Sequence, residues 1–254
     1  MNSISTIIIT RNEEKNIRDC LEAVRWTDEI VVVDTGSTDK TVSIAKKFTS
    51  KVFTQRWEGF GAAREFALRK CTKDWVLSVD ADERVTPPLK EEIQSVLRKG
   101  NNHAVGYAVP IKACFLGRWI LHCGWYPAYK TRIFRRDRSG YSESKLHEAI
   151  QVQGAVLKLR NDLLHYTDPD LFHYFEKLNR YTSLAADQLV QERTKFRISQ
   201  LLIRPFWTFI KMYFIKAGFL DGIQGFILCV LSSCYVFTKY AKLWEHAGKE
   251  ESFT

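Results

Sequence analysis

Two aspartates two residues apart, Asp80 and Asp82, are the residues whose types and spacing best suit metal chemistry. They follow the apolar, β-prone run Trp75–Val79, so we expect a strand to deliver both carboxylates to the rim of a sheet. Hard divalent cations such as Mg²⁺ and Mn²⁺ take oxygen ligands, and they often bind through one or two carboxylates plus phosphates. The pair therefore suits a metal held on a diphosphate, although Asp-x-Asp is also common in surface turns.

The elements around this pair alternate between strand and helix. Short runs that are β-branched and apolar nearly throughout predict strands covered on both faces, at 4–10, 30–34, 52–54 and 75–79. Apolar residues at helical spacing, or capping residues, predict helices at 13–24, after Asp34, at 59–69 and after Thr86-Pro87. This alternation predicts an α/β fold with a mostly parallel sheet, in which ligands bind outside the carboxyl ends of the strands.

Composition limits the partners of the chain. Its 254 residues form one large domain, or a domain with an extension, and the net charge of +9 predicts anionic partners. No arginine-rich tail, zinc-finger spacing or RNA-binding signature is present, so we expect no nucleic acid. The six cysteines show no metal spacing and the N-terminus shows no signal-peptide pattern, which predicts a cytoplasmic protein.

Three segments in order, Ile7–Glu13, Val31–Thr41 and Trp75–Glu83, resemble the family 2 glycosyltransferases of the GT-A fold. Further segments resemble the bacterial lipopolysaccharide-core branch, which includes the β-1,4-glucosyltransferases: 115–118, 124–127, 132–136, 146–148 and 218–222. The resemblance implies a Rossmann-like GT-A sheet and an inverting, metal-dependent enzyme. It would move a hexose, expected to be glucose, from a UDP-sugar to a lipopolysaccharide inner-core or related lipid-linked surface-glycan acceptor.

Within this resemblance, four residues would form the donor side of the site. Asp80 would approach the ribose and the sugar, and Asp82 would bind Mg²⁺ or Mn²⁺ on the diphosphate. Asp34 can accept hydrogen bonds from a uracil N–H or ribose hydroxyls, although an aspartate there also initiates turns. His165 follows another apolar run and is either a further metal ligand or a packed turn residue.

Arginines are the expected phosphate ligands, since guanidinium groups match phosphate geometry. Arg135 is the candidate, together with Arg132 and Arg136, and a solvated basic strand is the alternative. Arg64 is a weaker candidate, because related sequences often carry an amide-bearing residue where this chain has Glu65.

The acceptor side is expected to supply a base and aromatic contacts. Glu148 is the candidate general base, because inverting transfer needs a carboxylate that takes the acceptor hydroxyl proton. Glu143 is its competitor, and His147 would either orient Glu148 or pack. Trp125 and Tyr126 would stack on an acceptor sugar or belong to an aromatic core.

We expect a catalytic domain at 1–168, with a nucleotide-sugar half at 1–100 and an acceptor half at 101–168, followed by a helical extension at 169–254. Arg193–Lys216 mixes cations with large aromatics and has no acidic residue, which suits a helix lying in an anionic membrane interface. The uncharged stretch 222–238 is short for a span of about 20 residues. Peripheral association with the inner face of the cell membrane is therefore favoured over crossing, and a bundle packed on the catalytic domain is the third interpretation.

Two other function classes remain open from sequence. A nucleotidyltransferase would also use a metal and phosphates, but it usually carries a Gly-rich phosphate loop near the N-terminus, and Arg11–Glu13 is not one. A noncatalytic membrane-surface binding module is the other.

Overall fold

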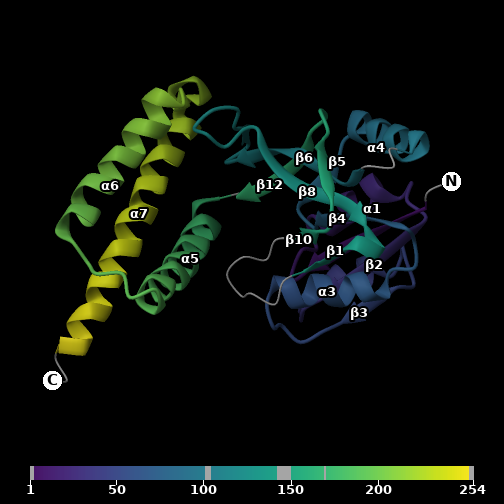
Figure 1. Ribbon diagram of the computed structural model, residues 1–254, viewed down its shortest axis with the longest axis horizontal. Helices are drawn as coiled ribbons and strands as arrows, with labels where there is room; N and C mark the ends of the chain where they lie inside the picture. The colour runs from purple at the N-terminus through teal and green to yellow at the C-terminus, as the bar shows by residue number, and fades with distance from the viewer. Residues whose placement is uncertain (1–2, 101–103, 142–149, 169, 252–254) are drawn as a thin grey trace. The chain divides into compact units, whose positions relative to one another are not determined.

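The computed structural model describes residues 3–100, 104–141, 150–168 and 170–251, and it divides into two compact units (Figure 1). The first unit contains Met1–Lys112 and Ala128–His165, and the second contains Ala113–Pro127 and Tyr166–Thr254. The second unit thus includes a segment that lies, in sequence, inside the expected acceptor half.

One sheet forms the centre of the first unit, and some of its strands continue into the second. Its order is β3-β2-β1-β4-β8-β6-β12-β5, with β7 and β11 paired to β6. The first four strands are parallel, and β8 joins β4 in the antiparallel direction. The strands are β1 (Ile4–Thr10), β2 (Glu29–Asp34), β3 (Val52–Thr54), β4 (Trp75–Asp80), β5 (Glu83–Val85), β6 (Ala104–Phe115), β7 (Arg118–Trp119), β8 (Ala128–Arg135), β11 (Ala155–Lys158) and β12 (Leu163–Asp168). A separate ladder joins β9 (Ser139–Tyr141) and β10 (Ile150–Val152).

Helices cover both faces of this sheet, which is why β1 is apolar almost throughout. Along β1, Ile4 and Ile8 belong to one apolar cluster, while Ile7 and Ile9 belong to another. Helices α1 (Ile17–Val24) and α4 (Pro87–Lys99) contribute to the first cluster, and α3 (Phe60–Lys70) contributes to the second. The short α2 (Thr41–Ala45) follows β2. The predicted mostly parallel, helix-flanked sheet is confirmed.

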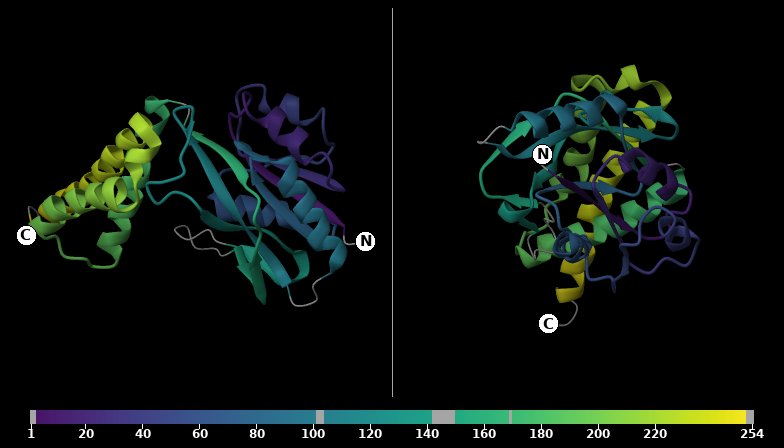
Figure 2. Two further views of the ribbon diagram at one scale, coloured as in Figure 1. Left: turned by 90° about the horizontal axis from the view of Figure 1, so that it is seen from above. Right: turned by 90° about the vertical axis from the view of Figure 1, so that its right-hand side faces the viewer.

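Three long helices dominate the second unit. They are α5 (Leu171–Gln191), α6 (Ile198–Ile210) and α7 (Gly222–Glu251), and the turns η2 (Lys211–Ile215) and η3 (Gly218–Asp221) connect the last two. Helix α7 packs against both α5 and α6 (Figure 2). Within 218–246, the helix has the length and apolar composition that a bilayer span requires.

Segment 113–127 completes the core of the second unit. Phe115, Ile120 and Cys123 pack with Leu228 and Leu231 of α7. The buried Asp221 carboxylate, just before α7, accepts hydrogen bonds from the backbone N–H groups of Leu121 and His122 at 3.2 and 2.8 Å. The start of α7 is therefore fixed to this segment by both apolar and polar contacts.

Candidate active site

The acidic residues singled out by sequence lie at one edge of the sheet. Strand β1 pairs in parallel with β2 on one side and β4 on the other, which sets Thr10 beside Asp34 and Ile9 beside Asp80. Asp34 and Asp80 therefore end strands that flank β1. This is the carboxyl edge, where parallel sheets bind ligands.

The Asp34 carboxylate stabilises the turn that follows β2. This carboxylate is buried and accepts hydrogen bonds from the backbone N–H groups of Gly36 and Ser37 at 3.1 and 3.0 Å, and from the Ser37 hydroxyl. Gly36 has φ +102°, a conformation that L side chains rarely adopt. Asp34 thus acts as a turn initiator, and its contact with a nucleotide stays a prediction.

Asp80 is held between two arginines. Arg64 Nη2 of α3 donates to Asp80 Oδ1 at 2.7 Å, and Arg132 Nη2 of β8 donates to Asp80 Oδ2 at 2.8 Å. Burial alone would raise the pKa of Asp80, but these two guanidinium groups outweigh it and hold that pKa far below its usual range. The carboxylate is therefore ionised and fixed in orientation.

Glu83 is a buried partner of Asp80 and Arg132. Its side chain is 0% exposed and accepts hydrogen bonds from Arg132 and from the backbone N–H of Asp80, the latter at 2.9 Å. Burial, together with the nearby Asp80 charge, raises the pKa of Glu83 against the opposing effect of Arg132. Arg132 thus bridges two carboxylates.

Both arginines also keep an unpaired donor. The Nε groups of Arg64 and Arg132 are buried and have no hydrogen-bond partner within the described part of the chain. A buried donor without a partner is costly, so such groups often mark the place of an absent ligand or water. Guanidinium donors beside a strand-end aspartate suit an anionic ligand.

Asp82 and His165 lie together, and their binding of a metal stays a prediction. Strand β12 pairs with β5, and His165 Nε2 lies 3.1 Å from Asp82 Oδ2. Burial lowers the pKa of His165, but the hydrogen bond and charge of Asp82 outweigh that effect and raise it above the ordinary value.

The donor set fits a divalent cation that completes its shell with phosphate and water. Both carboxylate oxygens of Asp80 form ion pairs with arginines. Asp82 and His165, which lie 3.1 Å apart, are therefore the candidate protein ligands of the cation. Among the described residues, no group of three or more His, Cys, Asp or Glu side chains could hold a metal. Mg²⁺ commonly binds through one or two carboxylates plus substrate phosphates, and Asp82 would be such a carboxylate.

The structure does not bring Arg135 to this edge. It lies opposite Trp75, at the start of β4 rather than its end, and it pairs with Asp137 at 3.1 Å. Successive residues of a strand face opposite sides, and β8 runs antiparallel to β4, so Arg132 reaches Asp80 while Arg135 lies toward the other end. A direct contact between Arg135 and a nucleotide sugar at Asp80 does not fit this placement.

The predicted acceptor residues are placed only in part. Trp125 and Tyr126 belong to the second unit, where the Trp125 ring packs against Phe115 with centroids 6.3 Å apart. Their stacking on an acceptor stays a prediction. Glu148 and its neighbours Glu143 and His147 lie outside the described residues, so the base assignment also stays a prediction.

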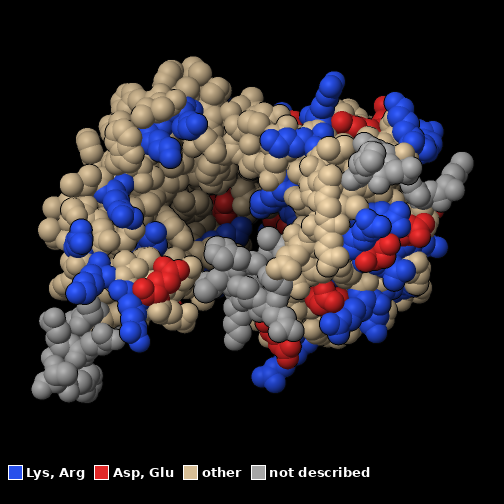
Figure 3. Space-filling model, in the orientation of Figure 1, with Lys and Arg blue, Asp and Glu red and all other residues tan. Residues whose placement is uncertain are grey.

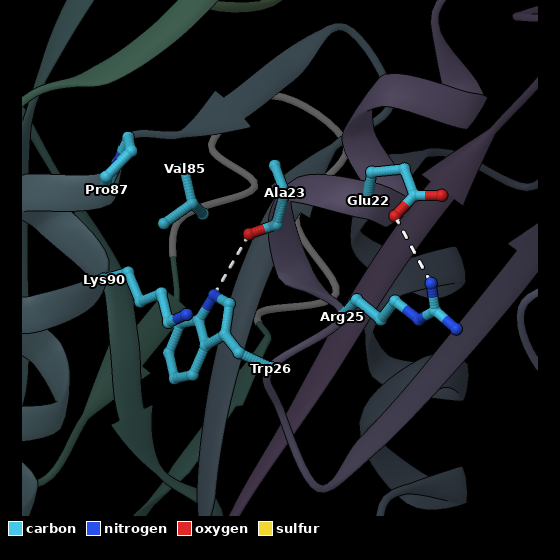
Figure 4. Close-up of a pocket in the computed structure, with 7 residues that line it drawn as sticks. All are labelled: Glu22, Ala23, Arg25, Trp26, Val85, Pro87 and Lys90. Atoms are coloured by element: carbon cyan, nitrogen blue, oxygen red, sulfur yellow. Dashed lines mark hydrogen bonds and ion pairs between the residues drawn. The ribbon is translucent and has the colours of Figure 1, made fainter.

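A groove of about 430 Å³ lies between α1, the end of β5 and the start of α4 (Figure 4). Trp26 forms one wall, with its indole N–H donating to the Ala23 carbonyl at 3.0 Å, and Arg25 lies 3.8 Å from Glu22. None of the predicted donor, metal or acceptor residues lines this groove.

Comparison with known proteins gives the family. The sequence profile described as glycosyl transferase family 2 matches residues 5–144. The lipopolysaccharide core biosynthesis glycosyltransferase LpsC of Rhizobium meliloti is 30% identical over 97% of this chain and 94% of its own length. The uncharacterized glycosyltransferase RT0209 of Rickettsia typhi is 31% identical over 99% of this chain and 90% of its own length.

A solved structure supports the fold. The mannosyltransferase PcManGT of Pyrobaculum calidifontis, solved with GDP-Man and Mn²⁺, aligns with a TM-score of 0.57 over 95% of this chain and 86% of that one. At 13% identity this likeness concerns the fold alone. Together with the profile match and the strand-end acidic residues, it confirms the resemblance drawn from sequence: the chain belongs to glycosyl transferase family 2 and is a glycosyltransferase.

Proposed function

We propose that this enzyme transfers a hexose, glucose in the first instance, from a UDP-sugar to a lipopolysaccharide inner-core or related lipid-linked acceptor, with inversion. The observation that carries the proposal is the strand-end group in which Asp80 is fixed by Arg64 and Arg132 beside the pair Asp82 and His165. The similarity to LpsC over nearly the whole chain supports the acceptor class.

Asp82 and His165 would hold Mg²⁺ or Mn²⁺, which when bound neutralises charge on the departing diphosphate. Asp80, kept ionised by its arginines, would accept hydrogen bonds from donor hydroxyls. The unpaired Nε groups of Arg64 and Arg132 would add donors for an anionic ligand.

On the acceptor side, Glu148 would take the proton of the attacking hydroxyl. That hydroxyl oxygen forms a bond to C1 of the sugar as the bond from C1 to the diphosphate breaks on the opposite face. A lipid-linked acceptor would place the reaction at the cytoplasmic face of the cell membrane.

Thermal stabilisation across nucleotide sugars, with and without Mn²⁺, tests the donor half of the proposal. A ligand that binds only the folded chain raises its melting temperature by mass action, so UDP-glucose with Mn²⁺ should give the largest shift, and Asp82→Asn should remove the Mn²⁺-dependent part. Asp187→Asn serves as the matched surface control, because Asp187 is an exposed aspartate of the second unit and is none of the predicted site residues. The same response to every nucleotide sugar, regardless of Mn²⁺, would contradict the donor assignment.

Turnover tests the acceptor half. Glu148→Gln should keep the UDP-glucose shift while lowering transfer to lipopolysaccharide-core acceptor by about 10²–10⁴-fold, because the amide cannot take a proton. Normal transfer by this variant would overturn the base assignment. Glu143→Gln is the control and should transfer at the wild-type rate.

A further inference from the structure

The outer side of α6 carries a stripe of large apolar side chains. Ile198, Leu202 and Phe206 recur at intervals of four residues, Ile203 and Trp207 lie beside them, and each is more than half exposed. Exposed apolar side chains repeated at helical spacing mark a face that leaves water for another apolar phase.

The apolar surface continues around the turn that joins α6 to α7. Phe214, Ile215, Phe219 and Leu220 of this turn are all about half exposed or more. Figure 3 shows mainly uncharged atoms over α6 and this turn, with Lys and Arg among them. We call α6 residues 198–207 and turn residues 214–220 the docking face.

The charged residues within the docking face and the segments that directly flank α6 are of one sign. The stretch Arg193–Lys216 has six Lys and Arg residues and no acidic residue. Mixed cations and aromatics on a helix suit the interface of an anionic bilayer, where apolar side chains enter the acyl boundary and cations meet the lipid headgroups. This charge pattern favours an anionic lipid surface over a protein partner.

Helix α7 is fixed to its neighbour α5 by a cation near its C-terminal end. Lys242 Nζ lies 2.8–2.9 Å from four oxygens of α5, which belong to Asn179, Thr182 and Ser183. Nearer the N-terminal end of α7, the Ser233 hydroxyl donates to the Pro205 carbonyl of α6 at 2.8 Å. These contacts join the three helices into one body.

That body is unsuited to crossing a bilayer. If α7 crossed with its contacts intact, α5 would enter the hydrocarbon together with its exposed Glu176, Arg180 and Asp187. Charged side chains in the hydrocarbon layer carry a large unfavourable free energy and are rare. Packing accounts for part of the apolar length of α7, since Leu228, Leu231 and Tyr240 are buried in the second unit, while other large apolar side chains of this helix remain exposed.

We propose that the second unit lies on one leaflet of an anionic membrane through the docking face, and that α7 does not cross. This extends the proposed function, because a lipid-linked acceptor lies in such a membrane. Its tests use no donor and no acceptor, so they can fail while sugar transfer stands, and the reverse.

Sedimentation of the full chain with vesicles tests the partner. Vesicles of phosphatidylglycerol and phosphatidylethanolamine should bind the protein, and phosphatidylcholine vesicles should bind it at least about tenfold more weakly, because each cation near an anionic surface contributes about fivefold. Raising the salt concentration from 0.1 to 0.5 M should weaken binding to the phosphatidylglycerol-containing vesicles, because salt screens the charges. Equal binding to both kinds of vesicle, or binding to neither, would overturn the proposal.

A matched pair of variants tests the face. Phe206→Ser with Trp207→Ser should weaken binding to the anionic vesicles by about tenfold or more, since both side chains lose apolar burial. Phe172→Ser is the control, because Phe172 of α5 is 69% exposed against 67% for Phe206. Far-ultraviolet circular dichroism checks that each variant is folded. An equal loss in the control, or no loss in the double variant, would refute the docking face.

Labelling tests whether α7 crosses. Trp244, exposed near the end of α7, is replaced by cysteine in a chain whose exposed Cys234 is serine. A membrane-impermeant maleimide should label this cysteine in lysed cells but not in intact spheroplasts of a Gram-negative host. Labelling in intact spheroplasts would mean that α7 crosses and would overturn the one-leaflet arrangement. The Cys234→Ser chain alone gives the background.

Discussion

Replacement of Arg132 by methionine should destabilise the first unit strongly, because it leaves a buried carboxylate without its cation. Arg132 Nη2 lies 2.8 Å from Asp80 and also bonds Glu83, whose side chain is fully buried. Asp80 keeps Arg64 in this variant, but within the described part of the chain Glu83 keeps only the hydrogen bond from the backbone N–H of Asp80. Breaking a buried ion pair on one side typically costs about 3–5 kcal/mol.

A second route gives a similar magnitude. If Glu83 takes up a proton in the variant, the cost at pH 7 is at most about 1.4 kcal/mol for each pH unit above the ordinary glutamate pKa of about 4.3, or about 3.7 kcal/mol. It is smaller to the extent that burial already raises the pKa of Glu83 in the unmodified chain. The destabilisation should accordingly shrink as the pH falls toward 4.3, where a protonated Glu83 no longer needs Arg132. Glu83→Gln combined with Arg132→Met should recover at least about 2 kcal/mol of the summed single effects.

Native-state hydrogen exchange of peptides from β4 and β8 measures this free energy within the first unit. Arg135→Met is the matched control on the same strand, and it should cost less than about 1 kcal/mol because its partner Asp137 is exposed. If Arg132→Met and Glu83→Gln each lower the free energy of unfolding by less than about 1 kcal/mol, and their effects add in the double variant, then the contacts of Arg132 with the two carboxylates do not stabilise the first unit.

Three further outcomes follow from contacts elsewhere. Burial would raise the pKa of Glu29, but Lys51 and neighbouring hydrogen bonds outweigh it and lower that pKa to about 2. Glu29→Gln should therefore lower the free energy of unfolding by about 2–3 kcal/mol above pH 4.5, and this difference should vanish as the pH falls toward 2. Urea denaturation measures it. Gly36→Ala should raise the Kd for UDP-glucose, measured calorimetrically, because φ +102° strains an alanine; an unchanged Kd would separate this turn from donor binding. Asp221→Asn should lower the melting temperature by several degrees through the loss of charge-assisted bonds to segment 113–127, and a full retention of stability would argue against that anchor.

Strand positions and the acidic edge could be predicted from sequence because the signals are local. Apolar runs define β1, β2 and β4, and in a parallel sheet the end of each such run falls at one edge, so Asp34 and Asp80 were placed correctly. Thr86 caps α4 as its position before Pro87 predicts, accepting the Leu89 N–H at 3.3 Å.

The partners of Asp80 could not be predicted, because they depend on the register of distant strands. Whether Arg132 or Arg135 reaches the site is decided by the pairing of β8 with β4, which places Leu77 opposite Ile133. Three arginines within five residues give no local signal that chooses among them. The burial of Glu83 likewise arises from β12, some 80 residues later, which pairs His165 with it.

The discontinuous second unit limits where this chain can be shortened. A protein ending after residue 168 would retain Phe115, Ile120 and Cys123 but lose Leu228 and Leu231, against which they pack. The apolar surface left without its packing partners would favour aggregation of such a fragment. Soluble production of the catalytic half therefore calls for redesign of segment 113–127 as well as removal of the tail.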